Sequence, residues 1–260
     1  MELREEKIIL IATKKSIEFL KPSKAIEYFV DITFKLTPRV HRPYKIMTIS
    51  CLDKEEQTPR LVCLIALLYL DTISYTKIFS YLKENYFFYP KVIHLDFETP
   101  LRNSIINSGI YEQKPLLVSC FFHFSANVRR KMEQLKITGK KFNKSAIEIL
   151  RNIELICFIK PNNIKKFSEI LNENLNKNEK NKKLYQCIYD YYTKKNPEIH
   201  NHSFIIDYAK DKNKEKYLKK LYLTNNIEES MHSKINILIK KVLQIICLLM
   251  QFKKYSLVMI

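Results

Sequence analysis

Three apolar runs rich in β-branched and aromatic residues follow one another over residues 26–34, 44–51 and 61–68. Proline and aspartate stand in the gaps between them, which favours turns, and short gaps suit antiparallel neighbours. From residue 73 the apolar side chains recur at spacings of three and four, and helices then alternate with short strands. The predicted order is βββαβαβα. This order implies an α/β fold with a mixed sheet, in which three antiparallel strands are followed by parallel α/β units.

The elements after the third run have predicted bounds of their own. Residues before 25 look helical or irregular, and Pro90 should end the first of the later helices. The remaining expected elements are helices over 73–86 and 99–108, short strands over 91–96 and 116–121, and a long helix beginning near His123 or Ser125.

The character of the chain changes after residue 139. Between residues 160 and 220 there are 15 lysines, no arginine and 8 acidic residues, and spaced aromatic residues suggest helices throughout. We therefore expect an all-helical insertion or second lobe. The expected segments are an N-terminal extension over 1–24, an α/β core over 25–139, the Lys/Asn-rich helical insertion over 140–222 and a C-terminal helix within 223–260.

Charge and glycine content narrow the classes of function. Lys and Arg total 45 against 27 acidic residues, so the formal net charge is +18. Such an excess favours a polyanionic partner, most often nucleic acid, although heavy use of Lys, Asn and Ile also reflects compositional drift. The chain has two glycines, Gly109 and Gly139, which excludes a Walker loop and a dinucleotide-binding GxGxxG loop.

The cysteines and the apolar stretches indicate a compartment. The six cysteines are widely spaced, form no CxxC pair and often lie in apolar runs, which is typical of buried reduced thiols in an intracellular protein. The N-terminus is charged and unlike a signal peptide. The apolar stretch 242–252 is shorter than the roughly 20 residues that a membrane-spanning helix needs. We therefore expect no membrane association and a buried helix there.

Two aspartates stand where chemistry is expected. Asp31 interrupts an otherwise apolar strand, and an unpaired buried carboxylate is costly. Asp96 ends a predicted parallel strand, where open α/β sheets bind ligands. If the two strands are neighbours, the carboxylates converge, and a hard divalent cation would relieve their repulsion. The alternative for each aspartate alone is a capping or strand-end role.

A third acid and a C-x-x-H pair have weaker signals. Glu229 falls at the third helical position after Asn226, a natural N-cap, so it is either a capping acid or a side chain that projects toward the two aspartates. His232 follows one turn later on the same helix face. Cys120 and His123 form a C-x-x-H pair, which alone is weak evidence for zinc because a zinc site needs four ligands.

Several motifs, in this order, resemble those of Mutator-like element (MULE) transposase domains. The most specific is SCFFHFS at 119–125, followed by Val128, Arg130 and Lys131, which is similar to the family's GCFFHFSQ.vwRK. The others are VDITFK at 30–35 with Pro38 and YKIMTI at 44–49, ALL at 66–68 with Tyr75, Ile78, Phe79 and Leu82, HLDFE at 94–98, and TNN at 224–226 with Glu229 and His232. Together these segments extend over almost the whole chain.

The resemblance implies an RNase H-like fold of the DDE transposase superfamily. It implies that a helical insertion precedes the last acid and that the C-terminal helix completes the core. Asp31, Asp96 and Glu229 would be the catalytic acids, holding Mg²⁺ or Mn²⁺ for DNA cleavage and strand transfer. The pair Cys120 and His123 would be structural or auxiliary, with zinc as its weaker candidate ion, and His232 falls in the same class.

The resemblance also implies partners. DNA is the expected substrate, bound by a homo-oligomer in the nucleus, or in the cytoplasm if the copy is decayed. The expected nucleic-acid contacts are Lys35, Arg129, Arg130 and Lys131.

The sequence departs from the family pattern after the first aspartate. Ile32 replaces the usual glycine there, and it either crowds the site or packs into the opposite face of the sheet.

Two other functions stay open beside the transposase. One is a catalytically inactive or domesticated DNA-binding or assembly module with the same fold, and the other is a Lys/Asn-rich structural protein without a nucleic-acid role.

Overall fold

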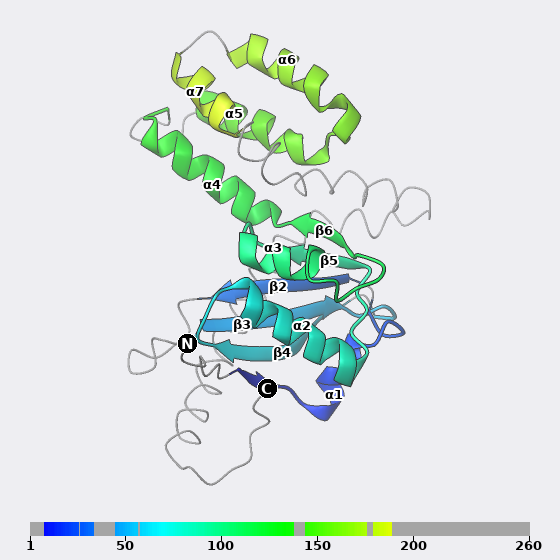
Figure 1. The fold of residues 1–260 in the computed structure, drawn as a ribbon. Coiled ribbons are helices and arrows are strands. Elements are labelled where there is room, and N and C mark those ends of the chain that lie inside the picture. Colours follow the sequence, from blue (N-terminus) through cyan, green and yellow to red (C-terminus); the bar gives the residue numbers. More distant parts are fainter. Residues whose placement is uncertain are drawn as a thin grey trace. The chain divides into compact units, whose positions relative to one another are not determined.

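The computed structural model describes residues 8–25, 27–33, 45–56, 58–137, 144–175 and 179–188. The described residues up to Leu116 belong to one compact unit and those from Leu117 belong to a second. The first unit contains most of a six-stranded sheet, and the second is largely helical (Figure 1).

The sheet is mixed, as the sequence predicts. Its strand order is β1-β4-β3-β2-β5-β6. The strands are β1 (Ile9–Ile11), β2 (Glu27–Thr33), β3 (Lys45–Leu52), β4 (Pro59–Leu67), β5 (Val92–Leu95) and β6 (Leu116–Ser119). The first four pair antiparallel, as β1 with β4, β4 with β3 and β3 with β2, whereas β2 and β5 run parallel. The parallel pair therefore lies beside the antiparallel strands, and β2 belongs to both.

Two helices of the first unit follow from clear sequence signals. α2 (Thr72–Tyr86) begins after Asp71, whose Oδ1 accepts a hydrogen bond from the Ser74 backbone N–H at 2.9 Å. It ends at Phe87, which takes the left-handed conformation, with φ of 57°, that glycine more often supplies. α3 (Thr99–Ile106) has Pro100 in its first turn, where the missing N–H costs no hydrogen bond.

An aromatic cluster joins α2 to one face of the sheet. Phe79 of α2 stacks on Phe88, with ring centroids 6.3 Å apart, and Phe88 meets Tyr28 of β2 edge-on at 4.8 Å. All three rings are fully buried. The Tyr28 hydroxyl faces three backbone carbonyls and donates most directly to Phe19 O at 2.9 Å. The face of β2 that carries Tyr28 is thus the one that α2 covers, so the side chain of Asp31 leaves the other face.

The second unit contains helices wherever the structure describes it beyond β6. These are α4 (Phe121–Gln134), α5 (Lys144–Glu154), α6 (Ile164–Leu175) and α7 (Glu179–Ile188), with the short 3₁₀ turns η3 (Leu155–Phe158) and η4 (Pro161–Asn163). Ala146, Leu150 and Ile153 are buried at spacings of three and four along α5. The Ser125 hydroxyl donates to Glu154 and thereby joins α4 to α5.

The prediction for the start of the chain is right about helices but misses a strand. Residues before 25 form not only the short helices α1 (Lys14–Ile17) and η1 (Glu18–Leu20) but also β1, which adds a strand to the edge of the sheet. Ile9 of β1 pairs with Ala66 and is buried. Three residues are too few to display a period of two, so only the pairing with β4 reveals this strand.

Burial of the described cysteines agrees with the expectation of reduced thiols for four of them. Cys51, Cys63, Cys120 and Cys157 are buried with free thiols, and Cys187 is exposed. Burial raises the pKa of Cys51 to about 12, so its reactive thiolate form is rare at neutral pH. Cys247 lies outside the described residues. In the described part of the chain, no helix combines the length and apolar character needed to span a bilayer.

Candidate functional site

Asp31 and Asp96 occupy corresponding positions on two neighbouring strands. β2 and β5 are parallel, with Val30 opposite Leu95; Asp31 is the next residue of β2, and Asp96 is the first residue after β5 ends. Parallel neighbours lie about 4.8 Å apart, and residues in register leave the same face of the sheet. The structure therefore places Asp31 near the carboxyl end of β2 and Asp96 directly after the carboxyl end of its parallel neighbour β5. Both side chains are partly exposed.

The same face carries a buried polar pair further back along the strands. Glu27 Oε1 and His94 Nε2 are 2.5 Å apart, and each side chain is 4% exposed. The Phe29 ring stacks on the His94 ring, with the two ring centroids 4.5 Å apart. Every second residue of a strand points to the same face, so Glu27, Phe29 and Asp31 lie on one side of β2.

β3 extends the polar face by two hydroxyl groups. Thr48 lies opposite Asp31 and Ser50 lies opposite Phe29, and both are buried. The Thr48 hydroxyl donates to the backbone carbonyl of Asp31 at 3.3 Å. This bond holds the main chain of β2 where the first aspartate leaves the sheet.

The loop after β5 is fixed by two hydrogen bonds. The Phe97 backbone N–H donates to Asp96 Oδ1 at 2.6 Å, and the buried Tyr75 hydroxyl of α2 donates to Glu98 Oε1 at 2.9 Å. Burial raises the pKa of Glu98, the Tyr75 bond opposes this, and the nearby charge of Asp96 raises it further. Glu98 is therefore close enough to Asp96 for their carboxylates to repel each other.

Oxygen ligands of this kind suit a hard divalent cation such as Mg²⁺ or Mn²⁺. The repulsion between the carboxylates of Asp96 and Glu98 is what such a cation would relieve. Among the described residues, no group of three His, Cys, Asp or Glu side chains is arranged to hold a metal ion. The described residues alone therefore do not form a complete metal site. The predicted third acid, Glu229, and the predicted auxiliary His232 lie outside the described residues.

The other predicted site residues belong to the second unit or are not described. Cys120 is the buried N-cap residue of α4, and His123 lies in the first turn of that helix, so the C-x-x-H pair spans the helix start. Arg129 and Arg130 are exposed further along α4, and Lys131 is partly buried. The predicted contact Lys35 lies outside the described residues.

Two features of the site had been missed from the sequence. The pairing of Glu27 with His94 and the approach of Glu98 to Asp96 were not predicted. The sequence does contain a signal, because every second residue of a strand shares a face. Glu27, Phe29 and Asp31 form one such series, and His94 and Asp96 form another. Predicting that the two series meet requires the strand register.

Ile32 points away from the aspartates. It pairs with Met47 of β3, and the pleat directs it to the face that α2 covers.

We expect Ile32→Gly to lower the free energy of unfolding by about 1–2.5 kcal/mol, because glycine is unfavourable within a strand and the apolar contacts of Ile32 are lost. Urea denaturation measures this. The same variant should not gain metal-dependent DNA cleavage, and a clear gain would mean that Ile32 obstructs the site.

Neither the comparison with protein-family models nor the comparison with curated proteins gives a match for this sequence.

Proposed function

We propose that the chain is a DDE-type transposase domain with an RNase H-like fold, which cuts and joins DNA strands with the help of divalent cations. The observation that carries the proposal is that Asp31 lies on β2 and Asp96 directly follows β5, the parallel neighbour of β2. The strand order β4-β3-β2-β5-β6 around that pair is compatible with an RNase H-like sheet. The motif resemblance, whose segments include both aspartates, supports the same assignment.

In this proposal Asp31 and Asp96 hold Mg²⁺ or Mn²⁺, with Glu229 as the third ligand. Bound divalent cations would supply an activated water or 3′-hydroxyl and stabilise the leaving 3′-oxygen. The protein's own contribution is to fix the carboxylates. Thr48 steadies the main chain at Asp31, and the bond from Tyr75 to Glu98 steadies the loop that carries Asp96.

DNA would be held by cations that contact phosphates without distinguishing bases. Arg129 and Arg130 are the best placed of the described candidates, because both are exposed on α4. The lysines of α6 and α7 would extend this contact.

The salt dependence of DNA binding tests that role. If both arginines contact phosphates, Arg129→Gln with Arg130→Gln should reduce the slope of log affinity against log salt by about 1.8, since each contact contributes roughly 0.9. Fluorescence anisotropy with a labelled duplex at several salt concentrations measures the slope. The matched control removes two exposed lysines of α1, Lys14→Gln with Lys15→Gln, and should leave it nearly unchanged. Equal slopes for all three proteins would contradict the assignment.

Cleavage of supercoiled plasmid by the purified chain tests the proposed activity. We expect nicks to accumulate with Mg²⁺ or Mn²⁺ and to stop when the cation is chelated. DNA binding without any metal-dependent nicking would instead favour the inactive DNA-binding module. Retention on a DNA column that does not respond to salt would favour a structural protein without a nucleic-acid role.

A further inference from the structure

The buried pair of Glu27 and His94 takes no part in the chemistry proposed for the aspartates. Glu27 Oε1 and His94 Nε2 are 2.5 Å apart, and each side chain is 4% exposed. Replacing a buried polar pair by apolar residues of similar size is often neutral or stabilising, so stability alone does not account for such a pair. In some proteins a buried polar group instead specifies how two elements align.

The alignment of β2 with β5 depends on few residues. Four residues of each strand lie opposite one another, from Glu27 with Val92 to Val30 with Leu95. On the face that α2 covers, β5 contributes Ile93 and Leu95, which are 0% and 2% exposed. Because side chains repeat every two residues along a strand, a slip of two residues would keep both on that face. Apolar packing therefore distinguishes poorly between registers that differ by two residues.

His94 makes two contacts with β2 on the other face. Nε2 lies beside Glu27 Oε1, and the imidazole stacks on the Phe29 ring, with centroids 4.5 Å apart and planes inclined by 15°. Phe29 is directly opposite His94, whereas Glu27 is two residues earlier along β2. A slip of two residues in either direction would move His94 off the Phe29 ring, and one of the two slips would also carry it away from Glu27.

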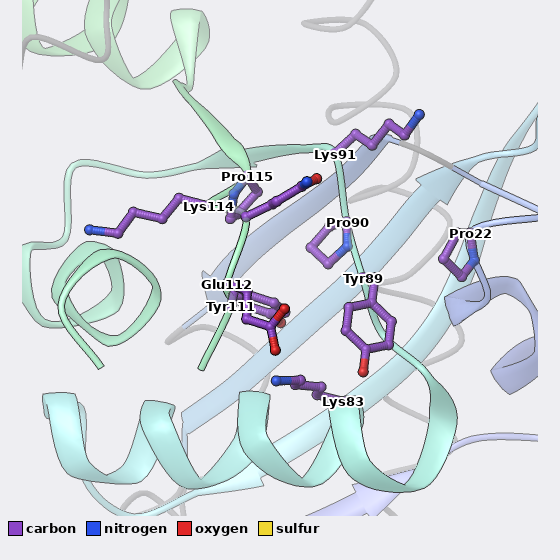
Figure 2. Close-up of a pocket in the computed structure, with 10 residues that line it drawn as sticks. Pro22, Lys83, Tyr89, Pro90, Lys91, Tyr111, Glu112, Lys114 and Pro115 are labelled. Atoms are coloured by element: carbon purple, nitrogen blue, oxygen red, sulfur yellow. The ribbon is translucent and has the colours of Figure 1, made fainter. Parts of the chain in front are cut away.

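The loop before β5 constrains the strand less at its other end. Tyr89, Pro90 and Lys91 line a cavity of about 500 Å³, to which the end of α2 and the loop before β6 also contribute (Figure 2). The Lys91 carbonyl accepts a hydrogen bond from the Leu116 N–H at 2.9 Å, which joins this loop to β6, on the side of β5 away from β2. Since open space adjoins the loop, packing there opposes a shift of β5 along β2 only weakly.

The register of the two strands decides where the aspartates stand. Asp31 follows Val30 on β2 and Asp96 follows Leu95, the last residue of β5, so the pairing of Val30 with Leu95 places both. A slip of two residues would move Asp96 by about 6.6 Å relative to Asp31. Oxygen ligands bind Mg²⁺ or Ca²⁺ at about 2.0–2.6 Å, so even a much smaller shift would alter how the two carboxylates share a cation.

We propose that Glu27 and His94 are positioning residues of the metal site, which hold β5 in register with β2, together with the stack on Phe29, and thereby set the separation of Asp31 and Asp96. This inference rests on the proposed function, because the pair acts on the metal site through the two aspartates. It gives a role to a buried polar pair that lies on the same two strands as the acids.

Mn²⁺ binding to the full chain tests this role with the double variant Glu27→Leu with His94→Leu. Electron paramagnetic resonance measures the affinity, and urea denaturation measures the stability. We expect the double variant to stay folded and to bind Mn²⁺ at least fivefold more weakly than wild type. Glu27→Gln is the conservative variant, because an amide can donate to or accept from an imidazole nitrogen. It should bind Mn²⁺ within about twofold of wild type.

Tyr28→Phe is the matched control. It removes a buried hydroxyl from the same strand, which donates to Phe19 O at 2.9 Å on the face away from His94, so it should lose stability but keep its Mn²⁺ affinity. If the double variant does not fold, Phe29→Leu replaces it. This variant keeps the bond between Glu27 and His94 but loses the stack, and it should bind Mn²⁺ at least twofold more weakly.

The outcomes separate this role from the proposed function. The positioning role is overturned if the folded double variant, or Phe29→Leu in its place, binds Mn²⁺ like wild type. It is also overturned if Glu27→Gln loses as much affinity as the double variant, or if Tyr28→Phe does, because the loss would then not follow the bond between Glu27 and His94. Wild-type protein that binds no Mn²⁺, or binds it equally well in Asp31→Asn and Asp96→Asn, overturns the metal site itself and this role with it.

Discussion

Asp31→Asn and Asp96→Asn are each expected to reduce metal-dependent DNA nicking by roughly 100-fold or more, which corresponds to about 2.7 kcal/mol of lost transition-state stabilisation. The reason is electrostatic. An asparagine amide keeps the size of the side chain but removes the negative charge that a divalent cation requires. Initial rates of plasmid relaxation in Mg²⁺ or Mn²⁺ measure the effect, and circular dichroism checks that each variant is folded.

Asp71→Asn is the matched control for this pair of variants. Asp71 caps α2 through its contact with the Ser74 backbone, and asparagine caps helices about as well as aspartate. This variant should therefore keep both stability and nicking. If the Asp31 and Asp96 variants nick DNA as fast as Asp71→Asn does, the carboxylate pair is not the catalytic site.

Glu27→Ala is expected to lower the free energy of unfolding by about 3–5 kcal/mol, the largest stability effect that we predict for a single substitution. Glu27 and His94 are both buried and bonded to each other, so removing Glu27 takes away this buried bond and leaves a space where its side chain packs. Urea denaturation followed by circular dichroism measures the change.

The double variant Glu27→Leu with His94→Leu distinguishes a lost partner from lost packing. Two leucines refill much of the space without burying a polar group, and such replacements are often neutral or stabilising. We therefore expect the double variant to be more stable than Glu27→Ala. A cost below about 1 kcal/mol for Glu27→Ala would contradict the buried pair itself.

The sequence predicts most of the sheet because its strands and helices differ in period. The runs that became β2, β3 and β4 are apolar and separated by turn residues, and α2 has its apolar residues at spacings of three and four. From that order alone, Asp31 and Asp96 could be expected at one edge of the sheet. The strand pairing adds that the residues directly before them, Val30 and Leu95, lie opposite each other.

The interactions that depend on register could not be predicted. Glu27 and His94 are 67 residues apart, and a slip of one residue between β2 and β5 would send one of them to the other face. Short strands such as β1 could not be predicted either, because only their pairing with a neighbouring strand reveals them.

Binding of Mn²⁺ to the full chain, followed by electron paramagnetic resonance, tests the aspartate pair most directly because it needs neither DNA nor turnover. The free-ion signal should fall in a saturable way as protein is added. Asp31→Asn and Asp96→Asn should each weaken this binding at least tenfold, whereas Asp71→Asn should bind like wild type. Mn²⁺ binding that is absent from the wild-type protein, or that survives unchanged in both aspartate variants, would contradict a metal site at the carboxyl ends of β2 and β5.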